Sequence, residues 1–237
     1  MVYNHRNMGQ YSFKPADSIG HFQKFIEQVY AIPDDRQYSL WDLLDQEQRF
    51  AMRALKGIRK NDAEKLKLNL LISFSWMMAI ANRLHIDIEN EVWKRFPSLC
   101  SYCGQKPCAC KTIKAAERFA VHNSDALKPA DLAGFQQMFE GIYPTANRTV
   151  PEAGVHLAEE SGEVSEAIHS FLGEHKAEQF DEVRTEIADF VSCIFGLANS
   201  AHIDLAQELS KMYSDNCHVC HAAPCACTFT TIAALRT

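Results

Sequence analysis

Apolar residues recur along this chain every third or fourth position, and they rarely alternate strictly with polar residues. This spacing is typical of amphipathic helices, and the 237 residues include only 10 glycines and 8 prolines. We expect helices in the second half near 131–142, 153–171, 179–200 and 203–214. Residues 171–179 read as the loop between the middle two, with Gly173 ending the first of them. No segment predicts a strand, so the predicted fold class is all-α.

The chain contains an internal repeat. Residues 82–110 match residues 199–227 without a gap, and the match pairs His85 with His202 and four cysteines with four others. Upstream, FQKFIEQVY resembles FQQMFEGIY. Eight cysteines that repeat in phase are poorly explained by chance, and self-similarity at a fixed offset indicates a repeated structural unit.

We therefore divide the chain into a first repeat (1–112), a connector (113–127) and a second repeat (128–237). With four helices in each repeat, the expected architecture is two four-helix units packed as a helical bundle with pseudo-two-fold symmetry.

Composition excludes two classes of partner. The formal net charge is −6 and no run of basic residues occurs, which argues against a nucleic-acid polymer or an anionic membrane surface. The most apolar stretch, residues 70–81, is shorter than the roughly 20 residues of a membrane span. Residues 1–20 lack the apolar core of a secretory signal, so we expect a cytoplasmic protein.

Two acidic pairs in the second repeat predict a cation site. Glu160 and Glu163 are three residues apart, as are Glu186 and Asp189, and residues with this spacing share one helical face. Four carboxylates on neighbouring helices would repel one another unless a cation lay between them. Carboxylate oxygens suit Mg²⁺ or Mn²⁺, and such ions assist the hydrolysis of phosphoanhydrides. The simpler interpretation of any one pair is a solvated helix face.

The pattern E-x-x-E at 160–163, then E-x-x-D at 186–189 followed by an apolar run, resembles the MazG-like all-α nucleotide pyrophosphohydrolases. The resemblance covers residues 153–216. It implies Mg²⁺-dependent cleavage of a nucleoside triphosphate to the monophosphate and pyrophosphate, in a house-cleaning role. It also implies that the four acids bind the metal and that Lys211 and Asn216 contact the substrate.

The first repeat departs from this pattern. At the positions of the four acids it has one acid and three other residues: Glu47, Phe50, Asn69 and Ile72. We therefore expect no catalytic metal there. Because members of the family commonly form dimers, we interpret the first repeat as a built-in partner in an intramolecular pseudo-dimer. Whether that pseudo-dimer pairs again is left open.

Each repeat ends in the cysteine pattern C-x₂-C-x₄-C-x-C. We call these the first cysteine group (Cys100, Cys103, Cys108 and Cys110) and the second cysteine group (Cys217, Cys220, Cys225 and Cys227). Four thiolates can complete a structural tetrahedral Zn²⁺ site, so two zinc ions are predicted. Disulfides and an iron–sulfur cluster are the alternatives. The ninth cysteine, Cys193, is interpreted as a core residue.

Two functions of different classes remain. The first is the pyrophosphohydrolase, in which a cluster glutamate or the adjacent Glu159 could accept a proton from the attacking water. The second is a catalytically silent, zinc-stabilised nucleotide sensor or protein-interaction module. The motif Glu166-x-x-His169 hints at a di-iron site, but such sites need a second motif of this kind. Candidates for contact with the base are Tyr143, His156 and Tyr213.

Overall fold

The computed structural model describes residues 12–113, 119, 124–235 and 237, so most of the predicted connector and residues 1–11 lie outside the described residues. The described chain forms helices and no strands, which confirms the all-α prediction. The helices are α1 (Ile19–Gln37), α2 (Leu40–Lys60), α3 (Ala63–Arg83), α4 (Ile88–Arg95), α5 (Leu132–Ile142), α6 (Val150–Glu174), α7 (Ala177–Ser200), α8 (Leu205–Met212) and α9 (Phe229–Ala233), with short 3₁₀ turns at Asp125–Leu127 and Thr145–Asn147. None of these helices is long and apolar enough to cross a membrane.

Polar side chains define where the helices begin. Ser39 and Thr149 start α2 and α6, and each forms a capping box with the acid three residues later, Asp42 or Glu152. These bonds satisfy amide N–H groups that have no partner inside the helix.

The predicted bounds of the loop between α6 and α7 are wrong. Helix α6 continues through Gly173 to Glu174, and only His175 and Lys176 connect it to α7. His175 ends the helix in the left-handed conformation (φ 55°), a position that glycine usually occupies. Across the turn the rings of Phe171 and Phe180 pack 5.0 Å apart, and this contact fixes the tight connection.

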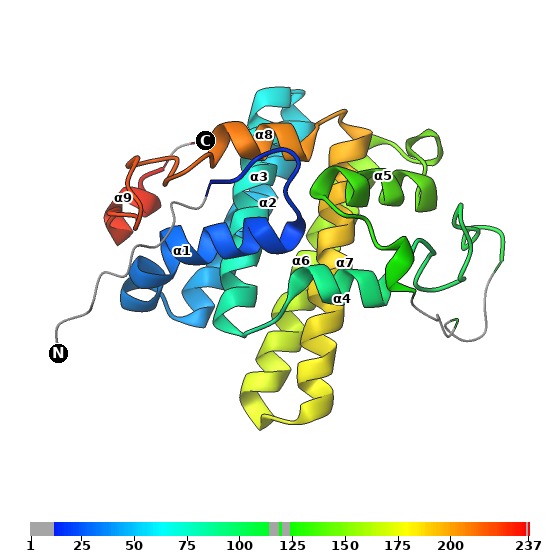
Figure 1. The fold of residues 1–237 in the computed structure, drawn as a ribbon, viewed down its shortest axis with the longest axis horizontal. Coiled ribbons are helices and arrows are strands. Elements are labelled where there is room, and N and C mark those ends of the chain that lie inside the picture. The colour runs from blue at the N-terminus through cyan, green and yellow to red at the C-terminus, as the bar shows by residue number, and fades with distance from the viewer. Residues whose placement is uncertain (1–11, 114–118, 120–123, 236) are drawn as a thin grey trace.

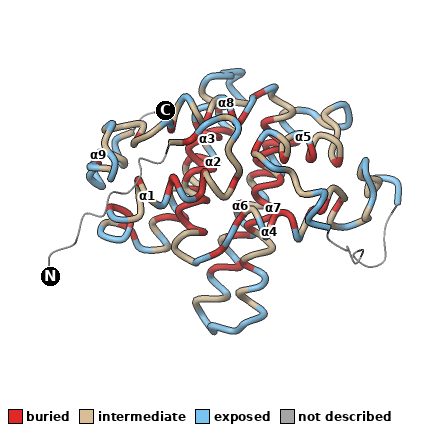
Figure 2. The backbone as a smooth tube through the Cα atoms, in the orientation of Figure 1, coloured by how far each residue is buried: buried red, intermediate tan, exposed pale blue. Residues whose placement is uncertain are grey.

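The centre of the molecule is built from α2, α3, α6 and α7. Helix α2 packs on α3, α6 packs on α7, and α2 and α6 pack against each other between the two pairs. Buried apolar side chains from both halves line these contacts and form one continuous core, seen as the buried inner faces in Figure 2.

Each repeat fastens its first helix in the same way. The Gln23 side chain donates to Asn82 Oδ1 (3.0 Å) and to the Ile86 carbonyl (2.7 Å), and it accepts from the Ile88 N–H (3.0 Å). The second repeat makes the same three bonds, at the same three lengths, from Gln136 to Asn199, Ile203 and Leu205. The two matching sequence segments therefore form the same local structure in both repeats.

Helices α4 and α8, which occupy matching positions in the two repeats, each contact both repeats. Helix α4 packs on α1 of its own repeat and on α7 of the other, and α8 packs on α5 of its own repeat and on α3 of the other. In Figure 1, α8 lies beside α3, α9 lies near α1, and α4 lies across α7. A salt bridge from Lys67 on α3 to Glu208 on α8 (3.3 Å) joins one of these pairs. Each repeat therefore extends its C-terminal part onto the other repeat, an arrangement that we call the exchange of C-terminal parts.

Candidate functional site

Three of the four predicted acids come together between α6 and α7. One carboxylate oxygen from each of Glu160, Glu163 and Glu186 lies within 4.8 Å of the others. We call these three residues the acidic cluster. The i, i+3 spacing places the first two on one face of α6, and the close packing of α6 on α7 brings up Glu186.

The acidic cluster is short of compensating positive charge. Burial, together with the charges of Asp189 and Glu163, raises the pKa of Glu160 to about 8 and that of Glu186 to about 7. One oxygen of Glu160, Oε2, is buried without a hydrogen-bond partner. An orphaned buried carboxylate oxygen is costly, and a bound cation would satisfy it.

The fourth predicted acid, Asp189, has a different partner. Both of its oxygens accept hydrogen bonds from Arg95 of α4, at 2.9 Å from Nε and 2.6 Å from an Nη atom. The two side chains are 15% and 17% exposed, so this ion pair is largely shielded from water. Asp189 is thus held by an arginine of the first repeat and stands beside the acidic cluster.

The structure does not bring the two predicted substrate-contacting residues to the acidic cluster. Lys211 Nζ donates to Glu208 (2.6 Å), and Lys211 shares a surface groove with Asp62 and Lys65 at the start of α3. Asn216 immediately precedes the second cysteine group. The reason is the exchange of C-terminal parts, which packs α8 against α3 as well as α5 and places the second cysteine group beside α1.

Of the three candidates for contact with a base, one is inaccessible. Tyr213 is completely buried, and its hydroxyl donates to Ser75 inside the core (2.9 Å). Tyr143 is half-buried, and its hydroxyl donates to Cys100 Sγ (3.5 Å). His156 is exposed on α6.

Both cysteine groups have the dimensions of a tetrahedral metal site. Sulfur atoms are 3.7 Å apart in Cys100–Cys110 and 4.0 Å apart in Cys103–Cys108. In the second group the corresponding distances are 3.9 Å and 3.8 Å. A tetrahedron with Zn–S bonds of about 2.3 Å has edges of roughly 3.8 Å, whereas a disulfide bond is only about 2.05 Å long. These spacings fit metal coordination and not disulfides.

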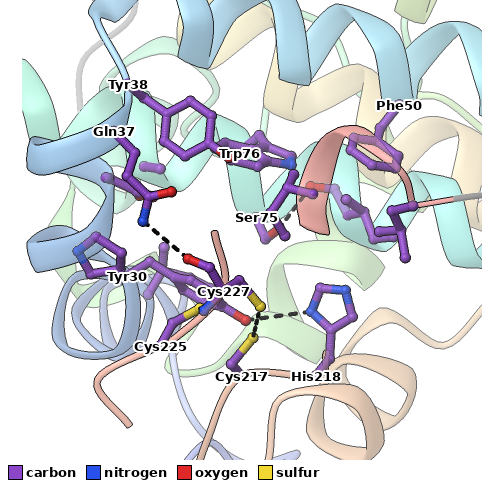
Figure 3. A pocket seen from close by; sticks show the side chains of 17 residues that line it. Tyr30, Gln37, Tyr38, Phe50, Ser75, Trp76, Cys217, His218, Cys225 and Cys227 are labelled. Carbon is purple, nitrogen blue, oxygen red and sulfur yellow. Dashed lines mark hydrogen bonds between the residues drawn. The ribbon is translucent and has the colours of Figure 1, made fainter. Parts of the chain in front are cut away.

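Each cysteine group is anchored to the first helix of the other repeat. The Cys225 N–H donates to the Val29 carbonyl on α1, and the Cys108 N–H donates to the Ile142 carbonyl on α5, both at 2.7 Å. Figure 3 shows the second cysteine group beside α1, with Gln37 donating to the Cys227 carbonyl (3.0 Å). The cysteine groups therefore hold the two repeats together.

Cys193 belongs to neither group. It packs against the core, and burial raises the pKa of its thiol. A protonated thiol is a poor nucleophile.

The first repeat has no counterpart of the acidic cluster among its described residues. Glu47 is completely buried in the core and accepts hydrogen bonds from Ser73 (2.8 Å) and Ser161 (2.7 Å). Asn69 accepts a hydrogen bond from Thr237 (2.5 Å). Arg49 also donates to carbonyl groups of the C-terminal segment. The C-terminal segment thus covers this face of the first repeat.

Burial raises the pKa of Glu47 to about 7 from its usual 4.5, although the bonds from Ser161 and Ser73 lower it. The native state therefore binds this proton more tightly than the unfolded chain does. The resulting stability is fully present below pH 4.5 and is lost as pH rises through about 7, a difference of about 3 kcal/mol. We expect Glu47→Gln to be more stable than the wild type at pH 8 by up to about this amount, and nearly equal at pH 4.

Urea unfolding at the two pH values measures this difference. Asp45→Asn, which changes an exposed carboxylate on the same helix, serves as the control and should leave the pH dependence as it is. An equal effect of Glu47→Gln at both pH values would contradict the prediction.

Sequence reasoning missed Arg95. In the sequence this residue is one cation near the end of a short helix, and only the packing of α4 on α7 brings it to Asp189. The available signal was a difference between the repeats: at the offset that pairs Lys94 with Lys211, Arg95 corresponds to Met212.

Comparisons with protein-family models, with curated proteins and with solved structures gave no significant match. Function must therefore be argued from the site itself.

Proposed function

We propose that this protein is a Mg²⁺-dependent nucleoside triphosphate pyrophosphohydrolase of the MazG-like kind. The observation that carries the proposal is the acidic cluster: three carboxylates from two helices within 4.8 Å, one of them with a buried oxygen that has no hydrogen-bond partner. The composition of the site, all oxygen donors and partly open to solvent, suits Mg²⁺ or Mn²⁺ better than a softer metal.

In this proposal Glu160, Glu163, Glu186 and, once released from Arg95, Asp189 would hold the cation. A bound divalent cation would supply neutralisation of the phosphate charge and activation of water. Glu163 and Glu159 are exposed on α6, so either can accept the proton of the attacking water. Water would attack the α-phosphorus, the bond to the bridging oxygen would break, and pyrophosphate would leave.

We further propose that the chain is an intramolecular pseudo-dimer of two MazG-like units, each holding one structural Zn²⁺ in its cysteine group. The matched contacts of Gln23 and Gln136 support this interpretation. The tetrahedral sulfur spacings support zinc, because Zn²⁺ bound by four thiolates has no open position and serves structure.

A panel of ribo- and deoxyribonucleoside triphosphates with Mg²⁺, scored for pyrophosphate release, tests the activity. We expect release with at least one nucleotide and a loss of at least 100-fold in kcat/KM for Glu163→Gln. The matched control is Glu166→Gln, an exposed glutamate one turn further along the same helix, which should retain activity. Equal activity of Glu163→Gln and the wild type would refute the assignment of the site.

The second candidate is a catalytically silent nucleotide sensor or interaction module. It is favoured by the first repeat, where the C-terminal segment covers the face that would bear the acids. Nucleotide binding without pyrophosphate release across the whole panel would favour this candidate over the enzyme.

A further inference from the structure

A positive charge beside the acidic cluster comes from the other repeat. Arg95 lies near the end of α4 in the first repeat and binds both oxygens of Asp189 on α7. The guanidinium also lies near Glu186, the other acid that α7 contributes.

Arg95 and a divalent cation would compete for Asp189. Both oxygens of Asp189 accept hydrogen bonds from the guanidinium, and a metal ion that shared their remaining lone pairs would be repelled by its positive charge. An ion with two charges among four carboxylates is favoured over a guanidinium with one, because the Coulomb energy scales with the charge. Entry of the metal would thus free N–H groups of Arg95 beside the place where the cation sits.

A freed guanidinium is suited to phosphate. Arginine presents five N–H donors in a planar fork that matches phosphate oxygens, and such charge-assisted bonds are the stronger ones. The second repeat offers Met212 at the corresponding position, and Lys211 is paired with Glu208. The packing of α4 on α7 therefore supplies a cation that the second repeat lacks at the corresponding position.

We propose that Arg95 is the phosphate-binding residue of the site, contributed by the first repeat. It holds Asp189 in the structure, and it would donate to the phosphates of a nucleoside triphosphate if Asp189 were bound to a divalent cation. This inference rests on the proposed function and gives the first repeat a role in it.

The test uses the full chain and three variants. Arg95→Met introduces the residue that the second repeat has at this position, Arg95→Lys keeps the charge, and Lys94→Met removes a neighbouring cation that is 62% exposed. Binding of Mn²⁺ alone is measured by electron paramagnetic resonance. Binding of α,β-methylene analogues of the four ribonucleoside triphosphates, whose bridging group the proposed reaction cannot cleave, is measured by calorimetry at saturating Mn²⁺.

We expect Arg95→Met to bind Mn²⁺ about 10-fold more tightly, because the competitor for Asp189 is gone. We expect it to bind the analogues about 100-fold more weakly, because the phosphate ligand is gone. Arg95→Lys should recover part of the analogue binding, and Lys94→Met should resemble the wild type. If Arg95 had only a structural role, its substitution would not strengthen the binding of Mn²⁺ and at the same time weaken the binding of the analogues.

A failure of the proposed enzyme activity and a failure of the proposed role of Arg95 give different results. Wild-type protein that binds Mn²⁺ and the analogues but hydrolyses no nucleotide refutes the proposed enzyme, while the binding measurements still decide the role of Arg95. Unchanged or weaker Mn²⁺ binding in Arg95→Met, or unchanged analogue binding, overturns the proposal for Arg95 even in an active enzyme. If Arg95→Met does not fold, Arg95→Lys decides. Wild-type affinity of this variant for both Mn²⁺ and the analogues overturns the proposal. Somewhat tighter binding of Mn²⁺ together with somewhat weaker binding of the analogues supports it.

Discussion

Cys225→Ser is expected to lower the melting temperature by more than 10 °C and to loosen α1, a helix of the repeat that does not contain Cys225. The second cysteine group is largely inside the protein, with Cys217 completely buried and Cys227 7% exposed. The N–H of Cys225 itself bonds to Val29 on α1. Binding of structural Zn²⁺ contributes directly to folding, and a loss of about 4 kcal/mol or more corresponds to such a shift at roughly 2–4 °C per kcal/mol.

The paired variant Cys108→Ser should have the mirrored effect. Its N–H bonds to Ile142 on α5, so hydrogen exchange should rise in α5 and not in α1. Elemental analysis should find two zinc ions per wild-type chain and one in each variant. Cys193→Ser, outside both groups, is the control and should retain both ions. Loosening of the helix in the same repeat as the mutated cysteine would contradict the exchanged arrangement.

The second large effect is the dependence of the metal affinity on pH. Burial first, and then the charges of Asp189 and Glu163, raise the pKa of Glu160 to about 8 and that of Glu186 to about 7. A cation binds the deprotonated carboxylates, so it must displace these protons. The affinity for Mg²⁺ or Mn²⁺ should therefore increase with pH, by roughly 500-fold between pH 6 and pH 8, and level off above pH 8.

Calorimetric titration with Mn²⁺ at three pH values measures this slope, and repeating it in buffers of different ionisation enthalpy counts the protons released. Glu160→Gln removes one of the two groups and should flatten the slope as well as weaken binding. Glu182→Gln, an exposed acid on α7, should leave the slope intact. An affinity independent of pH would mean that the acidic cluster is already ionised and has no need of a cation.

The local features of this protein were predictable from the sequence because they depend on spacing. Two glutamates three residues apart must share a helical face, and Glu160 and Glu163 do so. Cysteines in the same pattern in both repeats predicted two groups of like geometry, as the sulfur distances confirm. Gly173 misled the prediction of the α6 end, because the turn is set by the contact between Phe171 and Phe180, and His175 adopts the strained conformation instead.

The sequence does not show that the C-terminal part of each repeat packs against the other repeat. Helix α4 packs on α1 of its own repeat and on α7 of the other, and the repeated pattern does not predict the second contact. That contact decides the neighbour of Asp189, so Arg95 was not considered. Lys211 and Asn216 were predicted to contact the substrate only because of the family resemblance.

The exchange has a consequence for how such a chain can evolve. A repeat that lacks the four acids would ordinarily be free to disappear from the gene. Here its deletion would also remove the arginine that binds Asp189 and the α1 carbonyl that receives the N–H of Cys225. Loss of the first repeat would therefore leave Asp189 and the second cysteine group without these two partners.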